Sequence, residues 1–278
     1  MVRRPASAAS EAPNLHTNTL PHPPAGPALA GDGRDRTRQA RTALSAAMAG
    51  ILLFLAVNIV LQLAPPHYSA VSQAVSDLAV GPYGWVMDVA FALSGLSILA
   101  FVAGARLATS PETRSRVGFA FLSIWGAAAL AIAIAHPDVV DAHGYLGTRR
   151  AFDASPSTHG KVHLIVAAVV FLSMALGLVA SSRRLGREPR LASLQRPARR
   201  MAATVIAGLI LTDPLGTRGG YGLMERGVSL VGFGWLLMVA WRLRQPSGAP
   251  EAGESAATPV PVDGVQDPTP SLFCSYKL

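Results

Sequence analysis

The chain has 278 residues, of which 50% are hydrophobic and only 14% charged, whereas soluble globular domains carry about 25% charged residues. This composition excludes an ordinary soluble domain and indicates a protein that buries apolar surface in lipid. The formal net charge of +8 comes almost entirely from arginines at the ends of apolar stretches, which argues for membrane orientation and against a nucleic-acid partner.

Six apolar stretches follow one another along the chain and predict transmembrane helices. They cover residues 43–64, 85–105, 117–135, 162–181, 201–212 and 227–241. Four of them hold about 19–22 residues. A helix of that length, rising ~1.5 Å per residue, crosses a hydrocarbon layer of ~30 Å. The predicted fold class is therefore all-α, a polytopic membrane bundle of six transmembrane helices over residues 43–244.

The positive charges are unevenly distributed over the segments outside these stretches. Alternate segments, starting from the N-terminal tail, hold 19 of the 24 Lys and Arg residues, and the other segments hold 5. Segments rich in Lys and Arg stay in the cytoplasm. We therefore predict a multi-pass protein of the cell membrane with both termini cytoplasmic and with the first, third and fifth loops outside.

The two tails lack the apolar periodicity of a folded segment. Residues 1–42 are basic and rich in Pro, Ala and Ser, and residues 245–278 are rich in proline. Such compositions bury too little apolar surface to offset the entropy of ordering. Both tails are predicted to be disordered.

Small residues recur at helical spacing within the predicted helices. The second stretch carries Ala90, Ser94, Ser97 and Gly104, and the sixth begins at Gly227. Because lipid supplies no hydrophobic drive for helix pairing, small residues typically mark helix–helix contacts in membranes. We expect these positions to lie in such contacts.

Ionisable residues gather at the predicted outer ends of the helices. A charge at membrane depth is costly, so these groups should face a polar pocket and have partners there. The candidates are His136, Asp138, His159, His163, Asp213 and Glu225.

His159 and His163 are four residues apart and would share one face of a helix, as metal-binding histidine pairs do. His136 would be the third ligand of a zinc or iron ion, with Asp138 or Asp213 as other choices. The alternative is that these histidines form hydrogen bonds with neighbouring acids and bind no metal.

The acidic candidates allow two interpretations. A desolvated carboxyl group at Asp213, Glu225 or Asp138 would act as a general acid, with His136 as a base. Alternatively, Asp213 pairs with Arg226 and braces the fifth and sixth helices. In the first loop, Ser76 and Asp77 are expected to cap a short helix.

Several short motifs resemble one known family. They are Tyr68-Ser69, Ser76-Asp77-Leu78, Gly81-Pro82-Tyr83-Gly84-Trp85-Val86-Met87, His136, His159, His163, Gly222-Leu223-Met224-Glu225-Arg226 and Trp235. Over about residues 45–243 the chain resembles the membrane family catalogued as domain of unknown function 998. The resemblance implies six spans and an outward-facing set of polar residues, and it brings no activity with it.

The leading hypothesis is a membrane protein with a polar pocket at the outer leaflet that acts, with metal assistance, on a lipid-like substrate. Its expected partners are membrane lipids, with no nucleic acid. The alternatives are a small transporter and an accessory or structural membrane subunit without catalysis.

Overall fold

The computed structural model describes residues 28–64, 68–138, 157–216 and 220–245, with the side chains of 28–32 and 212–216 left out. This part of the chain is helical, as predicted, and contains no strand. Its six α-helices are α1 (Ala28–Leu61), α2 (Gly84–Ala108), α3 (Arg116–Ile132), α5 (Thr158–Ser182), α6 (Gln195–Gly216) and α7 (Tyr221–Arg244). Three short 3₁₀ helices join them: η1 (Val75–Ala79), η2 (Leu185–Arg187) and η3 (Pro189–Leu194).

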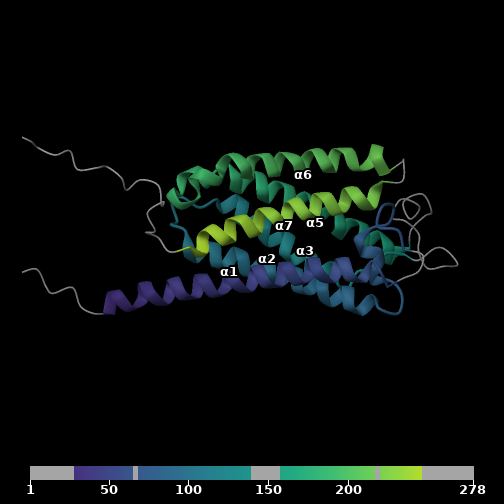
Figure 1. Ribbon diagram of the computed structural model, residues 1–278, viewed down its shortest axis with the longest axis horizontal. Coiled ribbons are helices and arrows are strands. Elements are labelled where there is room, and N and C mark those ends of the chain that lie inside the picture. The colour runs from purple at the N-terminus through teal and green to yellow at the C-terminus, as the bar shows by residue number, and fades with distance from the viewer. Residues whose placement is uncertain (1–27, 65–67, 139–156, 217–219, 246–278) are drawn as a thin grey trace, which may run out of the picture.

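The helices run along one common axis, and the first residues of α1 lie at the same end of the bundle as the last residues of α7 (Figure 1). At the opposite end α1 and α3 end, while α2, α5 and α7 begin. We call this opposite end the site end. The first loop, which contains η1, lies there together with the segments around α7 and α5 that carry the candidate residues.

Four helices, α1, α2, α5 and α7, are long and apolar enough to cross a membrane. The protein is therefore a helical membrane protein. Helix α3 is apolar but has 17 residues. Helix α6 starts with a polar turn that contains three arginines, and this turn lowers the mean hydropathy of the helix.

Helix α1 begins at Ala28 and not near residue 43, where the predicted disordered tail was expected to end. Its Ala40 is buried against the bundle. Helix propagation adds one hydrogen bond per residue once a helix has nucleated, so an apolar segment can extend a helix into a polar flank of good helix formers such as Ala, Arg and Gln. Composition alone does not reveal this extension.

Serine caps define two helix starts at opposite ends of the bundle. The Ser115 hydroxyl accepts a hydrogen bond from the Gly118 amide at 3.0 Å and starts α3. The Ser157 hydroxyl accepts one from the Gly160 amide at 3.1 Å and starts α5. Each cap satisfies an amide that has no partner within its own helix.

The predicted small-residue positions of α2 are buried, as expected for a packing face: Ala90, Ser94, Ser97 and Gly104. Helices α2 and α3 cross closely at Gly95 and Gly126. A Cβ atom added at Gly95 would lie 2.6 Å from the Gly126 carbonyl oxygen. Only glycine lets the two backbones approach this far. Gly227, by contrast, is exposed and would meet nothing within 4 Å, so the expected contact at this position is wrong.

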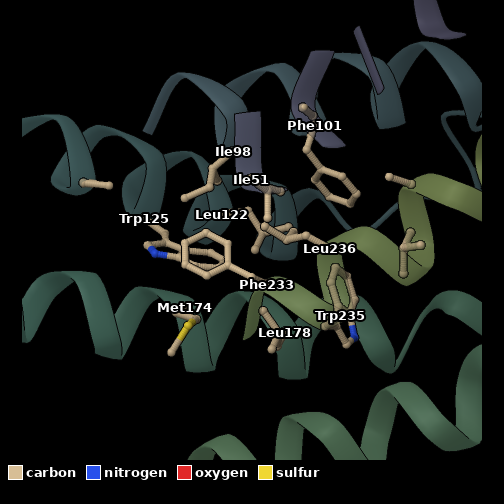
Figure 2. Close-up of a cluster of buried hydrophobic side chains, with 14 of the residues drawn as sticks. Ile51, Ile98, Phe101, Leu122, Trp125, Met174, Leu178, Phe233, Trp235 and Leu236 are labelled. Carbon is tan, nitrogen blue, oxygen red and sulfur yellow. The ribbon is translucent and has the colours of Figure 1, made fainter. Parts of the chain in front are cut away.

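Large side chains from five helices fill the middle of the bundle (Figure 2). Trp125 of α3 packs on Phe233 of α7, with ring centroids 5.3 Å apart. Closer to the end where α7 finishes, Phe101 meets Trp235 edge to face, at 6.1 Å. The Trp235 indole donates to the Ser182 hydroxyl at 3.0 Å, so its one polar atom is satisfied in the core.

Candidate functional site

A cavity of about 370 Å³ lies in the site end of the bundle, within the size range of small-molecule pockets. Helices α1, α2, α3, α5 and α7 and the 3₁₀ helix η1 all contribute to its lining. Its inner wall is aromatic. The Phe54 ring lies 5.2 Å from Phe233 and 5.8 Å from Phe91, and Trp125 continues the wall beyond Phe233. This wall offers apolar contact area to a hydrocarbon.

The margin of the cavity reaches the outside of the bundle between α1 and α7. Ile59 of α1 and Leu223 of α7 line the cavity and are 63% and 60% exposed. Gly227, one turn below Leu223, also lines it and leaves its margin open. In a bilayer these exposed apolar residues would face lipid. The cavity is thus shaped to be entered from the side.

Opposite the aromatic wall, the part of the lining nearest the site end carries polar side chains. They are Asn58, Gln62, Ser76, His163, Glu225 and Arg226, and two small hydroxyl side chains, Ser94 and Ser229, lie elsewhere in the lining. Aromatic rings on one side and polar side chains on the other give the cavity an amphipathic lining.

Arg226 attaches the first loop to the start of α7. Its Nη1 donates to the carbonyl oxygens of Ala70, Gln73 and Gly222 at 3.0, 2.8 and 2.9 Å. Its Nη2 donates to the Tyr68 hydroxyl, and the guanidinium lies 5.5 Å from the centre of the Tyr68 ring. The first loop therefore forms a roof over the cavity, and this guanidinium supplies several of the hydrogen bonds that fix it to α7.

Gly222 explains why the loop can come so close. A Cβ atom at this position would lie 2.1 Å from the Gln73 carbonyl oxygen and 2.7 Å from that of Ala70. The next amide, of Leu223, donates to the Val71 carbonyl at 3.0 Å. The motif Gly222-Leu223-Met224-Glu225-Arg226 is thus the docking site for the first loop.

Two carboxyl groups, of Asp77 and Glu225, meet the same turn of η1. Asp77 Oδ2 accepts from the Ala74 amide at 2.9 Å, and Glu225 Oε2 accepts from the Val75 amide at 3.1 Å. Asp77 is only 4% exposed. Burial, reinforced by the neighbouring negative charge of Glu225, raises the pKa of Asp77 to about 8. Burial also raises the pKa of the Tyr68 hydroxyl.

Asp77 was expected only as a helix cap. It lies within η1, and its carboxyl group reaches back to the amide before the helix. Sequence reasoning missed its proximity to Glu225, because the two residues are far apart in the chain. The one usable signal was the presence of two short polar motifs on the same predicted side of the membrane.

The histidines form a chain of hydrogen bonds beside the cavity. His136 Nε2 lies 3.0 Å from Asp88 Oδ1, and the His136 amide donates to His159 Nε2 at 3.1 Å. His163 Nδ1 donates to the Ala135 carbonyl at 2.5 Å. Of these residues only His163, which is 2% exposed, lines the cavity.

Asp138 has a structural partner on the next helix. Its carboxylate accepts from the Ser157 amide at 2.7 Å and from the Ser157 hydroxyl at 2.6 Å. The Ser157 hydroxyl bond is the main cause that lowers the pKa of Asp138. A Cβ at Gly160 would lie 2.2 Å from the carboxylate, so Gly160 makes room for Asp138 at the start of α5.

Across the described segments, no group of three His, Cys, Asp or Glu side chains could hold a metal ion. His136, His159 and His163 lie near one another, but each has a ring nitrogen committed to Asp88, to a backbone amide or to a backbone carbonyl. In the described residues the three rings do not form a three-ligand group, and their assignment to zinc or iron stays a prediction. The arrangement of His136 with Asp88 matches the alternative interpretation, a histidine hydrogen-bonded to an acid.

The side chain of Asp213 lies outside the described residues, although its backbone belongs to α6. Its role as an acid or as a brace for Arg226 stays a prediction. Glu225, the other acid of that group, lies at the cavity with Asp77 as its neighbour.

The family model described as "Protein of unknown function (DUF998)" matches residues 48–242. The chain belongs to this family. The match covers all the residues of the cavity and of the histidine chain, and it agrees with the resemblance carried by the short motifs. No curated protein and no solved structure matches the chain.

Proposed function

We propose that this DUF998 protein binds one lipid-like molecule in the cavity between α1 and α7. The observation that carries the proposal is the amphipathic lining, with Trp125 and Phe233 on one side and the polar groups of the site end on the other. An acyl or isoprenoid chain would lie on the aromatic wall. The exposed apolar margin at Ile59 and Leu223 would let such a molecule enter from the bilayer.

The core below the cavity favours a one-sided binding site over transport. Phe101, Leu178, Trp235 and Leu236 are fully buried there and pack across the bundle (Figure 2). A transporter would need a path that opens to both sides. The packed core supports a protein that binds a ligand from the leaflet at the site end.

Gly227 gives a direct test of lipid binding. Leucine at this position would extend into the cavity margin, and it is a better helix former than glycine by up to ~1 kcal/mol, so the fold should be retained. Native mass spectrometry of the protein extracted in mild detergent should find one bound lipid in the wild type and in Gly227→Ala, and none in Gly227→Leu. Equal lipid content in all three proteins would refute the proposal.

A catalytic role is the second candidate, and His163 is the observation that favours it. Its Nδ1 is committed to the Ala135 carbonyl, which leaves Nε2 as the basic nitrogen of a residue that lines the cavity. His163→Asn keeps an amide donor near the Nδ1 position and removes the base. If the protein is a lipid-directed enzyme, the variant should still bind lipid, more weakly than the wild type, and lose turnover. Identical membrane lipid profiles in cells expressing wild type or variant would argue for binding alone.

The six-span topology with cytoplasmic termini belongs to the same proposal. The common end of the start of α1 and the finish of α7 supports an even number of crossings (Figure 1). In a Cys274→Ser background, Ser69→Cys and Ser193→Cys would report the two ends of the bundle, and both positions are exposed. A membrane-impermeant maleimide should label the first in intact cells and the second only after permeabilisation. The reverse pattern would invert the topology.

A further inference from the structure

The cavity has a marked charge pattern that bears on the head group of its ligand. Arg226 is the single Lys or Arg among the described residues that line it. Its Nη1 donates hydrogen bonds to three backbone carbonyls, and its Nη2 donates to the Tyr68 hydroxyl. The remaining nitrogen, Nε, is buried without a hydrogen-bond partner and is closed off from the cavity space. Nη1 and Nε therefore offer no N–H to a ligand in the cavity, and Nη2 already has one protein acceptor.

Glu225, the residue next to Arg226, disfavours the binding of an anionic ligand. Glu225 lines the same part of the cavity and has one oxygen, Oε2, bonded to the Val75 amide. In either protonation state it offers no positive charge. A phosphate or sulfate group placed here would lose its hydration, would lie beside the Glu225 carboxyl group, and would have to compete with protein acceptors for the N–H groups of Arg226.

The other polar groups of the lining are neutral and supply both donors and acceptors. Gln62 Nε2 donates to Asn58 Oδ1 at 2.7 Å. This bond leaves Asn58 Nδ2 as a donor and Gln62 Oε1 as an acceptor, neither with a partner in the part of the chain that is described. His163 Nε2 is a further acceptor at the cavity, since its Nδ1 is held by the Ala135 carbonyl. Such a set suits hydroxyl or amide groups, which donate and accept at once.

We infer that the ligand is an amphiphile with an uncharged, hydroxyl- or amide-bearing head group, such as a monoacylglycerol, a long-chain alcohol or a fatty amide. This inference rests on the proposed lipid-binding function and narrows its ligand class. The apolar chain lies against Trp125 and Phe233, and the head group bonds to Asn58, Gln62 and His163.

Quenching of Trp125 fluorescence by brominated chains tests this directly. Trp85 and Trp241 are exposed at the two ends of the bundle and are replaced by phenylalanine, while the buried Trp235, which does not line the cavity, stays as a constant background. Two probes carry the same 9,10-dibromostearoyl chain, one as a monoglyceride and one as a lysophosphatidate. The monoglyceride should reach half-maximal quenching at an at least tenfold lower mole fraction in the micelle.

The controls separate this inference from the function on which it rests. Gly227→Leu should abolish quenching by the monoglyceride, which shows that the probe quenches from the cavity. If neither probe quenches Trp125 in the glycine protein, lipid binding itself is refuted. If both probes quench equally, or the phosphate probe quenches better, and Gly227→Leu still blocks them, lipid binding stands and the uncharged head group is refuted.

A substitution at Asn58 tests the proposed contact with the head group. Asn58→Leu keeps the side-chain size on α1 and removes the free amide donor. It should weaken the monoglyceride at least fivefold and leave the weak binding of the lysophosphatidate unchanged. An unchanged affinity for the monoglyceride would overturn the assigned contact.

Discussion

Arg226→Met should release the first loop from α7 while leaving the helices in the membrane. The substitution removes every hydrogen bond by which the guanidinium holds the loop: those to the carbonyls of Ala70 and Gln73, that to Gly222 of its own helix, and that to the Tyr68 hydroxyl. Methionine keeps the length and helix propensity of the side chain. The change therefore isolates the polar attachment from helix formation.

The expected loss of stability follows from the number and kind of these bonds. A hydrogen bond to a charged group contributes about 1.5–3 kcal/mol, and such bonds are not additive within one network. Arg226 is partly exposed, so water would recover some of the freed carbonyls. We expect a net loss of about 3–5 kcal/mol, the range for removing one member of a buried charged network. Arg226→Lys, which keeps the charge but cannot also reach Tyr68, should lose about 1–2 kcal/mol.

Two measurements report this loss. The free energy of unfolding is obtained from a sodium dodecyl sulfate titration followed by circular dichroism. The loop itself is monitored by Ala74→Cys in a Cys274→Ser background, because Ala74 is 1% exposed and should react with maleimide only when the loop opens. Arg200→Met, at an exposed position on α6, is the matched control and should change stability by less than about 0.5 kcal/mol.

Equal unfolding free energies and equal labelling rates at residue 74 for Arg226→Met and Arg200→Met would mean that the guanidinium does not hold the loop in the folded protein. Faster labelling without a loss of global stability would still confirm the attachment, because local opening can occur well below the free energy of unfolding.

Three further predictions test the rest of the structure. The raised pKa of Asp77 means that the folded state binds a proton which the unfolded chain, with an ordinary pKa of 3.8, releases, so stability should fall between about pH 4 and 8, by at most ~1.4 kcal/mol per pH unit. Asp77→Asn should remove the part of this fall that Asp77 contributes, and a constant difference between the two proteins across that range would contradict it. Gly95→Ala should destabilise the α2–α3 crossing by about 1–3 kcal/mol, whereas Gly227→Ala should not destabilise at all; similar unfolding curves for the two would show that the crossing is looser than described. Trp235→Phe should cost about 1–3 kcal/mol by leaving the Ser182 hydroxyl without its donor, and in the Ser182→Ala background the cost should be clearly smaller by a double-mutant cycle.

The membrane-embedded helices could be predicted from sequence because hydrophobicity summed over some 20 residues is a local property. Helices α2 and α5 begin and end within a few residues of the predicted stretches. The start of α1 could not be predicted in this way. Its first turns are polar, and a helix extends into such residues only because the apolar part has already paid the nucleation cost.

The gathering of histidines and acids at one end of the bundle was also visible in the sequence, since each predicted helix brings some polar group to that side. The hydrogen-bond partners of these groups could not be identified from the sequence. The sequence suggested His159 and His163 as neighbours of His136, and it did not reveal that His136 pairs with Asp88 of α2. Ring nitrogens take whichever acceptor the helix packing brings nearest, and spacing along one helix cannot identify a neighbour on another.

The sequence by itself thus determined that the chain is a helical membrane protein of this family with a polar end. Only the tertiary structure decided that Arg226 and Glu225 hold the first loop as the roof of an apolar cavity. The physical reason is that the partners of both side chains, apart from the Tyr68 hydroxyl, are backbone carbonyls and amides. Every residue carries these groups, so no residue type marks the ones that are used, and only the folded path of the chain selects them.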